Sequence, residues 1–108
     1  MEVILRKKEG SSPFSFVFKD GDKVLLKSEN YKAKKSALNG IESVRKNSQI
    51  DSRYELKTAK NGKFFFNIKA SNGQIVATST FFNSEEERKE AIEKIKKEAP
   101  NASLKEEL

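Results

Sequence analysis

Large apolar residues recur at every second position along two short segments of the chain, residues 14–18 and 64–68. Every second position of these segments carries a large apolar side chain: Phe14, Phe16 and Phe18 in the first, Phe64, Phe66 and Ile68 in the second. A period of two is typical of a β-strand that buries one face. Asp20-Gly21 and Asn72-Gly73 follow the segments, and such pairs tolerate the positive φ of a tight turn. Each segment is therefore predicted to begin a β-hairpin.

Two further strands are predicted around each of these segments. One follows each turn, at residues 23–28 and 74–80, and one precedes each Phe-rich segment, at residues 3–8 and 54–58. The apolar positions of these strands, and of the segments that follow them, form a set that we expect to point inward. In the first half of the chain the set contains Val3, Leu5, Phe14, Phe16, Phe18, Val24, Leu26 and Tyr31. In the second half it contains Tyr54, Leu56, Phe64, Phe66, Ile68, Ile75, Ala77 and Phe82.

The hydrophobic period then changes from 2 to 3.6 in both copies, which predicts a helix with one apolar face. The apolar stripes are Ala37, Ile41 and Val44 in the first copy, and Ala91, Ile92, Ile95 and Ala99 in the second. Ser84 and Glu87 have the spacing of a capping box, and Pro100 ends the second helix. The first helix has Ala33 at the capping position and Gly40 in its interior, so we expect it to be the weaker one.

The whole pattern occurs twice in the chain. A shift of 51 residues places Tyr31 on Phe82 and Ile41 on Ile92. The sequence therefore predicts an α+β protein of two tandem strand-strand-strand-helix repeats, with an antiparallel sheet and a pseudo-twofold axis. The expected parts are repeat 1 at residues 1–47, a linker at 48–53, repeat 2 at 54–99 and a C-terminal tail at 100–108. One repeat alone is too small to be stable, so we expect a single compact unit with a shared core.

Four short motifs then suggest a family. Residues 39–47 have the sequence NGIESVRKN, preceded by SENY at 28–31 and followed by YELK at 54–57 and NGKF at 61–64. These motifs resemble the YegP-like family of small bacterial tandem-repeat proteins, and the match extends over residues 3–99. The resemblance implies a compact α+β protein with three strands and a helix per repeat, and single-repeat relatives that can pair. It implies no activity, because the family is functionally uncharacterised.

The sequence departs from the family pattern in two places. Residues 90–95, EAIEKI, stand where the family favours an Asn-Gly-Ile start, and residues 11–15, SSPFS, form an unusual first turn. Only the first copy keeps Asn39-Gly40. A glycine inside a helix favours close packing of the helix on a sheet over a ligand site.

Composition narrows the possible chemistry. The chain has 108 residues and contains no His and no Cys. The commonest general base, the commonest zinc ligand, cysteine nucleophiles and disulfides are therefore excluded. No apolar run approaches the roughly 20 residues of a membrane helix, and the start MEVILRKKEG lacks the order of a secretory signal. We expect a cytoplasmic protein that is not an enzyme, needs no cofactor or metal, and does not bind membranes.

The net charge is +6, and the excess lies in the first half, where residues 1–50 contain 11 basic and 6 acidic side chains. Strand alternation places cations and one aromatic residue on the face of the sheet opposite the core. The possible nucleic-acid-binding residues on that face are Arg6, Lys8, Lys19, Lys23, Lys27, Lys57, Lys69 and Phe65. Lysine-rich outer strand positions are also common as protection against aggregation, and we favour that interpretation.

Several apolar residues are expected on the same outer face: Ile4, Val17, Leu25, Phe65 and Val76. They favour an interface between the repeats or a surface for a partner chain. The first hypothesis is therefore a noncatalytic interaction module that binds another, unknown protein through a sheet face or edge, as a monomer or homodimer. The alternative is nucleic-acid binding through the cationic face, with Phe65 stacking on a base.

Three other features do not indicate a catalytic, metal or phosphate site. The carboxylates of residues 85–93 compensate the positive end of a helix dipole. Asp20-Gly21-Asp22 lacks the further ligands of a calcium loop. The turns KNGK and SNGQ do not lead from a strand directly into a helix, as a phosphate loop must.

Overall fold

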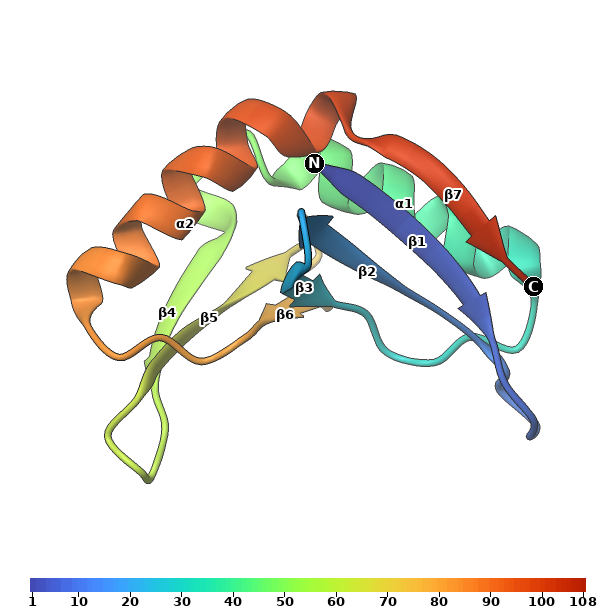
Figure 1. The fold of residues 1–108 in the computed structure, drawn as a ribbon, viewed down its shortest axis with the longest axis horizontal. Helices are drawn as coiled ribbons and strands as arrows, with labels where there is room; N and C mark the ends of the chain where they lie inside the picture. Colours follow the sequence, from blue (N-terminus) through green and yellow to red (C-terminus); the bar gives the residue numbers. More distant parts are fainter.

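Seven strands form one sheet in the computed structural model, which describes residues 1–108. The strand order is β4-β5-β6-β3-β2-β1-β7, and both helices lie on one side of the sheet (Figure 1). The strands are β1 (Glu2–Lys7), β2 (Phe14–Asp20), β3 (Lys23–Lys27), β4 (Tyr54–Thr58), β5 (Phe64–Lys69), β6 (Ile75–Ser79) and β7 (Ser103–Glu107). The helices are α1 (Lys34–Asn47) and α2 (Glu85–Glu98), followed by the short 3-10 turns Asp51–Arg53 and Ala99–Asn101. The predicted α+β class with two tandem repeats is confirmed.

The repeats join through their third strands at the centre of the sheet. β3 pairs antiparallel with β6, with Leu26 opposite Ser79 and Lys27 opposite Thr78. Lys27 and Thr78 occupy corresponding positions of the two repeats, so an approximate twofold axis passes between β3 and β6. The repeats therefore share one continuous sheet, a point that the sequence left open.

The core fills the space between the sheet and the helices. Its largest fully buried apolar side chains are Phe16, Phe18, Phe66, Leu5, Leu26, Ile41, Ile68, Ile95, Val3 and Val44. Phe16 stacks on Tyr31 with ring centroids 6.2 Å apart, and Phe66 stacks on Phe82 at the same separation. Helix α1 contacts β2 of its own repeat and β5 and β6 of the other. The core is thus common to both repeats.

A β-bulge in β3 corrects part of the predicted alternation. Phe18 lies opposite Leu26 and Lys19 lies opposite Val24, which leaves Leu25 as an extra residue on β3. Leu25, predicted on the outer face, is only 4% exposed and belongs to the core. Val24, predicted inward, lies on the outer face opposite Lys19. One inserted residue reverses the face of every position beyond it, and apolar alternation does not reveal the insertion.

The second repeat contains the same bulge. Ile68 lies opposite Ala77 and Lys69 lies opposite Ile75, which leaves Val76 as the extra residue on β6. Ile75, predicted inward, is 46% exposed, whereas Val76, predicted on the outer face, packs partly against the core. The two bulges occupy corresponding positions, so they belong to the repeat itself.

The C-terminal tail, whose order the sequence left open, forms a seventh strand. β7 pairs with β1 in parallel, with Val3 opposite Leu104, whereas every other neighbouring pair of strands is antiparallel as predicted. Two ion pairs support it: Lys34 with Glu106 at 2.6 Å, and Arg6 with Glu107 at 3.9 Å. The tail thus lies along the outer edge of β1.

Local signals in the sequence account for the turns and helix ends. Gly21 and Gly73 have φ of 60° and 86°, the left-handed conformation predicted for the hairpin turns. The Ser84 hydroxyl accepts a hydrogen bond from the Glu87 N–H at 3.1 Å, as the predicted N-cap of α2 requires. Ala33 makes no such bond, so α1 begins without a side-chain cap.

Candidate interaction site on the open face of the sheet

One face of the sheet points away from both helices (Figure 1). We call it the open face, and the strand register assigns to it Glu2, Ile4, Arg6, Ser15, Val17, Lys19, Val24, Lys27, Glu55, Lys57, Phe65, Asn67, Lys69, Ile75 and Thr78. Ile4 and Val17, which were predicted there, are only 3% and 6% exposed. The long side chains around them therefore cover this part of the face.

Three of the predicted nucleic-acid-binding cations lie on the open face without an ion-pair partner. They are Lys19 on β2, Lys27 on β3 and Lys57 on β4. Lys27 lies near the centre of the sheet, opposite Val17 on one side and Thr78 on the other. These lysines are the part of the predicted cationic face that is free to attract an anionic partner.

Two other predicted cations are neutralised on the same face. The Lys69 ammonium lies 2.8 Å from the Glu55 carboxylate, and Asn67 donates a hydrogen bond to that carboxylate at 3.0 Å. The Lys69 and Asn67 hydrogen bonds hold the pKa of Glu55 below its usual value. Arg6 faces Glu107 of β7 at 3.9 Å. The open face is therefore less basic than the sequence predicted.

Lys23 does not lie on the predicted face. It lies opposite Asp20, and its ammonium is 5.8 Å from the centre of the Phe82 ring, on the helix side of the sheet. The bulge at Leu25 is the physical reason, because it reverses the side on which Lys23 projects. Lys8 lies beyond the end of β1, in the loop that leads to β2. The structure thus does not bring these two lysines together with the others.

An aromatic pair of one half-buried and one exposed ring lies on the open face of the second repeat. Phe65 and Phe81 make an edge-to-face contact with ring centroids 5.6 Å apart, and Phe81 is 55% exposed. The sequence pattern predicted Phe65 on this face but not Phe81. The signal for Phe81 was its neighbour: Phe82 points inward, so the preceding side chain projects to the other side.

This pair belongs to a row of side chains that crosses several strands. Lys57 lies directly opposite Phe65, and Lys19 lies directly opposite Val24. The two halves meet where the Thr80 N–H, one residue before Phe81, donates to the Leu25 carbonyl at 3.1 Å. We call this row the aromatic stripe, defined as Lys57, Phe65, Phe81, Val24 and Lys19. It has an apolar centre and a lysine without an ion pair at each end. Glu2 of β1 lies directly opposite Lys19, just beyond the stripe.

The first repeat lacks the aromatic residues of the stripe. The positions that correspond to Phe65 and Phe81 are occupied by Ser15 and Asn30. The rest of the repeat folds alike, since Phe16–Tyr31 and Phe66–Phe82 form equivalent stacks. The exposed pair is therefore not required by the fold of the repeat.

A buried arginine supports the stripe from behind. Arg88 of α2 is 8% exposed, and it donates to the carbonyls of Lys57 and Phe65 at 3.0 and 3.5 Å. Its guanidinium also lies over the Phe64 ring at 5.3 Å. Its role is not visible in the sequence, because one Arg in a charged helix gives no signal of burial. Arg88 fixes the part of the β4–β5 ladder that carries Lys57 and Phe65.

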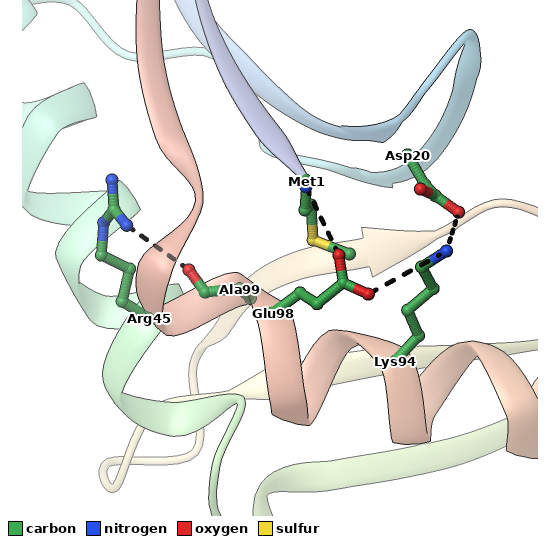
Figure 2. Close-up of polar contacts among 6 residues, drawn as sticks. All are labelled: Met1, Asp20, Arg45, Lys94, Glu98 and Ala99. Carbon is green, nitrogen blue, oxygen red and sulfur yellow. Dashed lines mark hydrogen bonds and ion pairs between the residues drawn. The ribbon is translucent and has the colours of Figure 1, made fainter.

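Several charged residues on the helix side form ion pairs. Two of them, Asp20 and Lys94, line a hollow of about 440 Å³ between α2 and the β2–β3 turn. Lys94 contacts Asp20 at 2.5 Å and Glu98 at 4.0 Å, and Glu98 also contacts the Met1 amine at 3.4 Å (Figure 2). The Lys94 hydrogen bond holds the pKa of Asp20 below its usual value. This network joins α2 to the first repeat, so we interpret it as structural.

Neither a metal centre nor a membrane span is present in the structure. No three His, Cys, Asp or Glu residues lie close enough together to hold a metal ion. Neither helix is long and apolar enough to cross a membrane.

The edge of the sheet at β4 differs from the corresponding edge at β1. Leu5 and Leu56 occupy equivalent positions, opposite Phe16 and Phe66 respectively. Leu5 is fully buried because β7 covers the outer edge of β1, whereas Leu56 is 56% exposed because no strand lies beyond β4. Leu56 was predicted to point inward, and its side chain is left uncovered at the edge.

Comparison with known proteins identifies the family. Residues 8–55 and 59–106 each match the model of a domain of unknown function, DUF1508. A UPF0339 protein of Acinetobacter baylyi is 48% identical over 103 residues, which cover 94% of this chain and 91% of that one. The UPF0339 protein YegP of Escherichia coli K12 is 42% identical over 99 residues, covering 91% and 90% of the two chains.

Two solved structures have the same fold. The solution structure of a UPF0339 protein from Shewanella oneidensis aligns with a TM-score of 0.87 at 40% identity, over 97% of this chain and 89% of that one. The solution structure of YegP from Escherichia coli, described as a protein of unknown function, aligns with a TM-score of 0.86 at 40% identity, over 97% and 90%. This chain carries two copies of a domain of unknown function and belongs to the YegP-like UPF0339 family.

Proposed function

We propose that this protein is a noncatalytic interaction module that binds an extended segment of another protein across the aromatic stripe. The observation that carries the proposal is the contact between half-buried Phe65 and exposed Phe81 on the sheet face opposite the helices, at positions where the first repeat has Ser15 and Asn30. Exposed aromatic residues beside polar groups are typical of contact surfaces between proteins. The absence of His and Cys favours binding over catalysis.

The charges of the open face favour a polypeptide over nucleic acid. Glu55 neutralises Lys69, and Glu107 faces Arg6, so carboxylates lie among the cations. A phosphate backbone would be repelled by these carboxylates, whereas a protein segment can place neutral or basic residues beside them. The unpaired Lys57 and Lys19 at the ends of the stripe attract acidic residues that flank an apolar one.

The geometry fixes the length of such a segment. Three strands, β5, β6 and β3, separate β4 from β2. Lys57 and Lys19 are therefore four strand spacings apart, roughly 19 Å at ~4.8 Å each. An extended chain covers that distance in about six residues at ~3.3 Å each. The matching probe is a seven-residue peptide with Glu at both ends, Trp in the middle and Thr elsewhere.

Peptide fluorescence tests the proposal directly. The protein contains no Trp, so the emission of the probe reports its environment without background. We expect saturable binding with a blue shift, and at least a tenfold weaker affinity for the Phe65→Ser/Phe81→Asn variant. That variant gives the second repeat the residues of the first, so it is expected to fold. Binding that the variant retains, or no binding by the unmodified protein, would refute the proposal.

Single-stranded nucleic acid is the second candidate ligand. Neither Lys57 nor Lys19 forms an ion pair, although Glu2 lies directly opposite Lys19. Base stacking on Phe65 with phosphate contacts to both lysines would use the same stripe. An oligothymidylate titration at about 50 and 200 mM salt separates the two candidates, because phosphate contacts weaken steeply with salt. Lys19→Ala/Lys57→Ala is compared with Lys35→Ala/Lys89→Ala, which removes the same charge from exposed positions of α1 and α2. Tight, salt-sensitive binding lost only in the first variant would promote nucleic acid over a peptide.

A further inference from the structure

The outer edge of β4 offers unpaired backbone groups. Ala59 donates to the Lys63 carbonyl, and hydrogen-bonded pairs alternate along an antiparallel ladder, so Lys57 and Glu55 also face β5. The N–H and C=O groups of the intervening residues, Leu56 among them, therefore face outward. Only the Tyr54 N–H is satisfied, by the Asp51 carbonyl of the preceding 3-10 turn.

The equivalent groups of the first repeat are paired. The N–H of Ser103 donates to the Met1 carbonyl, and β7 continues that pairing along Val3 and Leu5. The chain supplies a strand for the β1 edge and none for the β4 edge. An exposed strand edge with an exposed Leu is a template for pairing with another chain.

We propose that a second copy of this chain occupies the β4 edge, in an antiparallel β4–β4 pair with Leu56 on the twofold axis. The pair joins two sheets into one continuous sheet. The pair uses Lys57, which also belongs to the aromatic stripe, but it does not involve Phe65 or Phe81. It brings the stripes of the two copies to the same side.

The charges of β4 select this register. With Leu56 opposite Leu56, Glu55 of each copy lies opposite Lys57 of the other, on the open face. Because only alternate residues of β4 direct their N–H and C=O groups outward, the pairing of the two strands can also shift by two residues in either direction. One such shift sets Glu55 against Glu55, and the other sets Lys57 against Lys57, and both are repulsive. Only the central register is complementary in charge.

The same register satisfies the backbone. Leu56 exchanges its N–H and C=O with Leu56 of the second copy, and each Thr58 N–H donates to the Tyr54 carbonyl of the other chain. The two Leu56 side chains, each 56% exposed in the single chain, meet on the helix side. Charged edge residues deter most strands from pairing, and here they admit one partner in one register.

The short edge predicts weak association. β4 has 5 residues, so its pairing buries much less than the ~1,200 Å² of a standard interface. Dimerisation is expected at protein concentrations of about 0.1–1 mM, where weak contacts of this size become populated. Sedimentation equilibrium over that range measures it, and an isotope-filtered NOE between Leu56 methyl groups of labelled and unlabelled chains locates it.

Two variants test the register and the edge. Thr58→Pro removes an outward N–H without touching the bonds to β5, and Thr58→Ala keeps that N–H as the matched control. Lys57→Glu sets Glu55 against a second carboxylate. We expect Thr58→Pro and Lys57→Glu to weaken self-association at least tenfold, and Thr58→Ala to leave it unchanged. Thermal melting of each variant confirms that it is folded.

The outcomes separate this inference from the proposed function. A protein that remains monomeric at about 1 mM, or a dimer that persists in Thr58→Pro and Lys57→Glu, overturns the β4–β4 pair. Loss of peptide or nucleic-acid binding in Phe65→Ser/Phe81→Asn bears only on the aromatic stripe. A dimer that this variant retains and Thr58→Pro abolishes supports the inference, whether or not the aromatic stripe binds a ligand.

Discussion

The hydroxyl of Tyr31 lies where a side chain on Gly40 would begin. A β-carbon on Gly40 would be 2.6 Å from the Tyr31 Oη and 3.0 Å from Cε2 of Phe16. The second repeat has the complementary solution, because Phe82 lacks the hydroxyl and Ala91 stands at the position of Gly40. Gly40 thus permits close approach of α1 to the sheet, the interpretation that the sequence favoured over a ligand site.

This relationship predicts a non-additive pair of substitutions. Gly40→Ala is expected to lower the free energy of unfolding by about 1–3 kcal/mol, because overpacking outweighs the gain in helix propensity. Tyr31→Phe in the same chain removes the closest clash and copies the second repeat. The double variant should therefore recover most of the loss, with a coupling energy of about 1 kcal/mol or more in a urea-denaturation cycle. Additive effects would contradict the proposed contact.

The aromatic core predicts a large effect at one Phe and a small one at another. Phe66 is fully buried and stacks on Phe82, so Phe66→Ala is expected to cost about 3–5 kcal/mol and to unfold much of the protein. Phe81→Ala removes a ring that is 55% exposed, and it should change stability by about 0.5 kcal/mol or less. Thermal melts compare the two, and equal effects would mean that the core is wrongly assigned.

The missing cap of α1 predicts a stabilising substitution. Ala33 has φ −124° and ψ 147°, the conformation of an N-cap residue, but it has no side-chain oxygen. Ala33→Ser is expected to stabilise the protein by about 1 kcal/mol, which raises Tm by roughly 4–8 °C for a chain of this size. Ala33→Val is the control without a hydrogen-bond acceptor. An equal rise in Tm for the Val variant would show that capping is not the cause.

The sequence predicted most of the fold because the repeated signals are local. Alternation at Phe14–Phe18 and 64–68, the Gly turns and the Ser84 cap each depend on a few neighbouring residues. The bulges at Leu25 and Val76 were missed because an inserted residue is defined only by its partner strand. β7 was missed because its partners, the backbone of β1 and the ion-pair residues Lys34 and Arg6, lie far away in the sequence.

The candidate site was predicted in part for the same reason. Side-chain alternation along strands without an inserted residue placed Lys19, Lys57 and Phe65 on the correct face of the sheet. It misplaced Lys23, since that residue lies beyond the bulge. It also overestimated the charge of the open face, because the carboxylate that faces Arg6 comes from β7, a strand that the sequence pattern does not reveal.

The ion pair of Asp20 and Lys94 predicts a pH dependence of stability. The Lys94 hydrogen bond lowers the pKa of Asp20 below its ordinary value of 3.8. A carboxyl whose pKa is lower in the folded state stabilises that state above its unfolded pKa, and the contribution is lost as the pH falls through the folded pKa. The loss is therefore expected below pH 3.8. NMR titration of Asp20 should give a pKa that rises toward the ordinary value in Lys94→Met, and no change would argue against the pair.

Arg88 predicts a local effect on one hairpin. Its guanidinium is buried and donates to the carbonyls of Lys57 and Phe65, whereas the corresponding residue of the first repeat is Ala37. Arg88→Met keeps the length of the side chain and removes these charge-assisted hydrogen bonds, which are worth about 1.5–3 kcal/mol. Amide hydrogen exchange should accelerate in β4 and β5 and stay unchanged in β1 and β2, which have no equivalent support. Uniform acceleration would show that Arg88 stabilises the whole core instead, and the aromatic stripe would then lose its separate support.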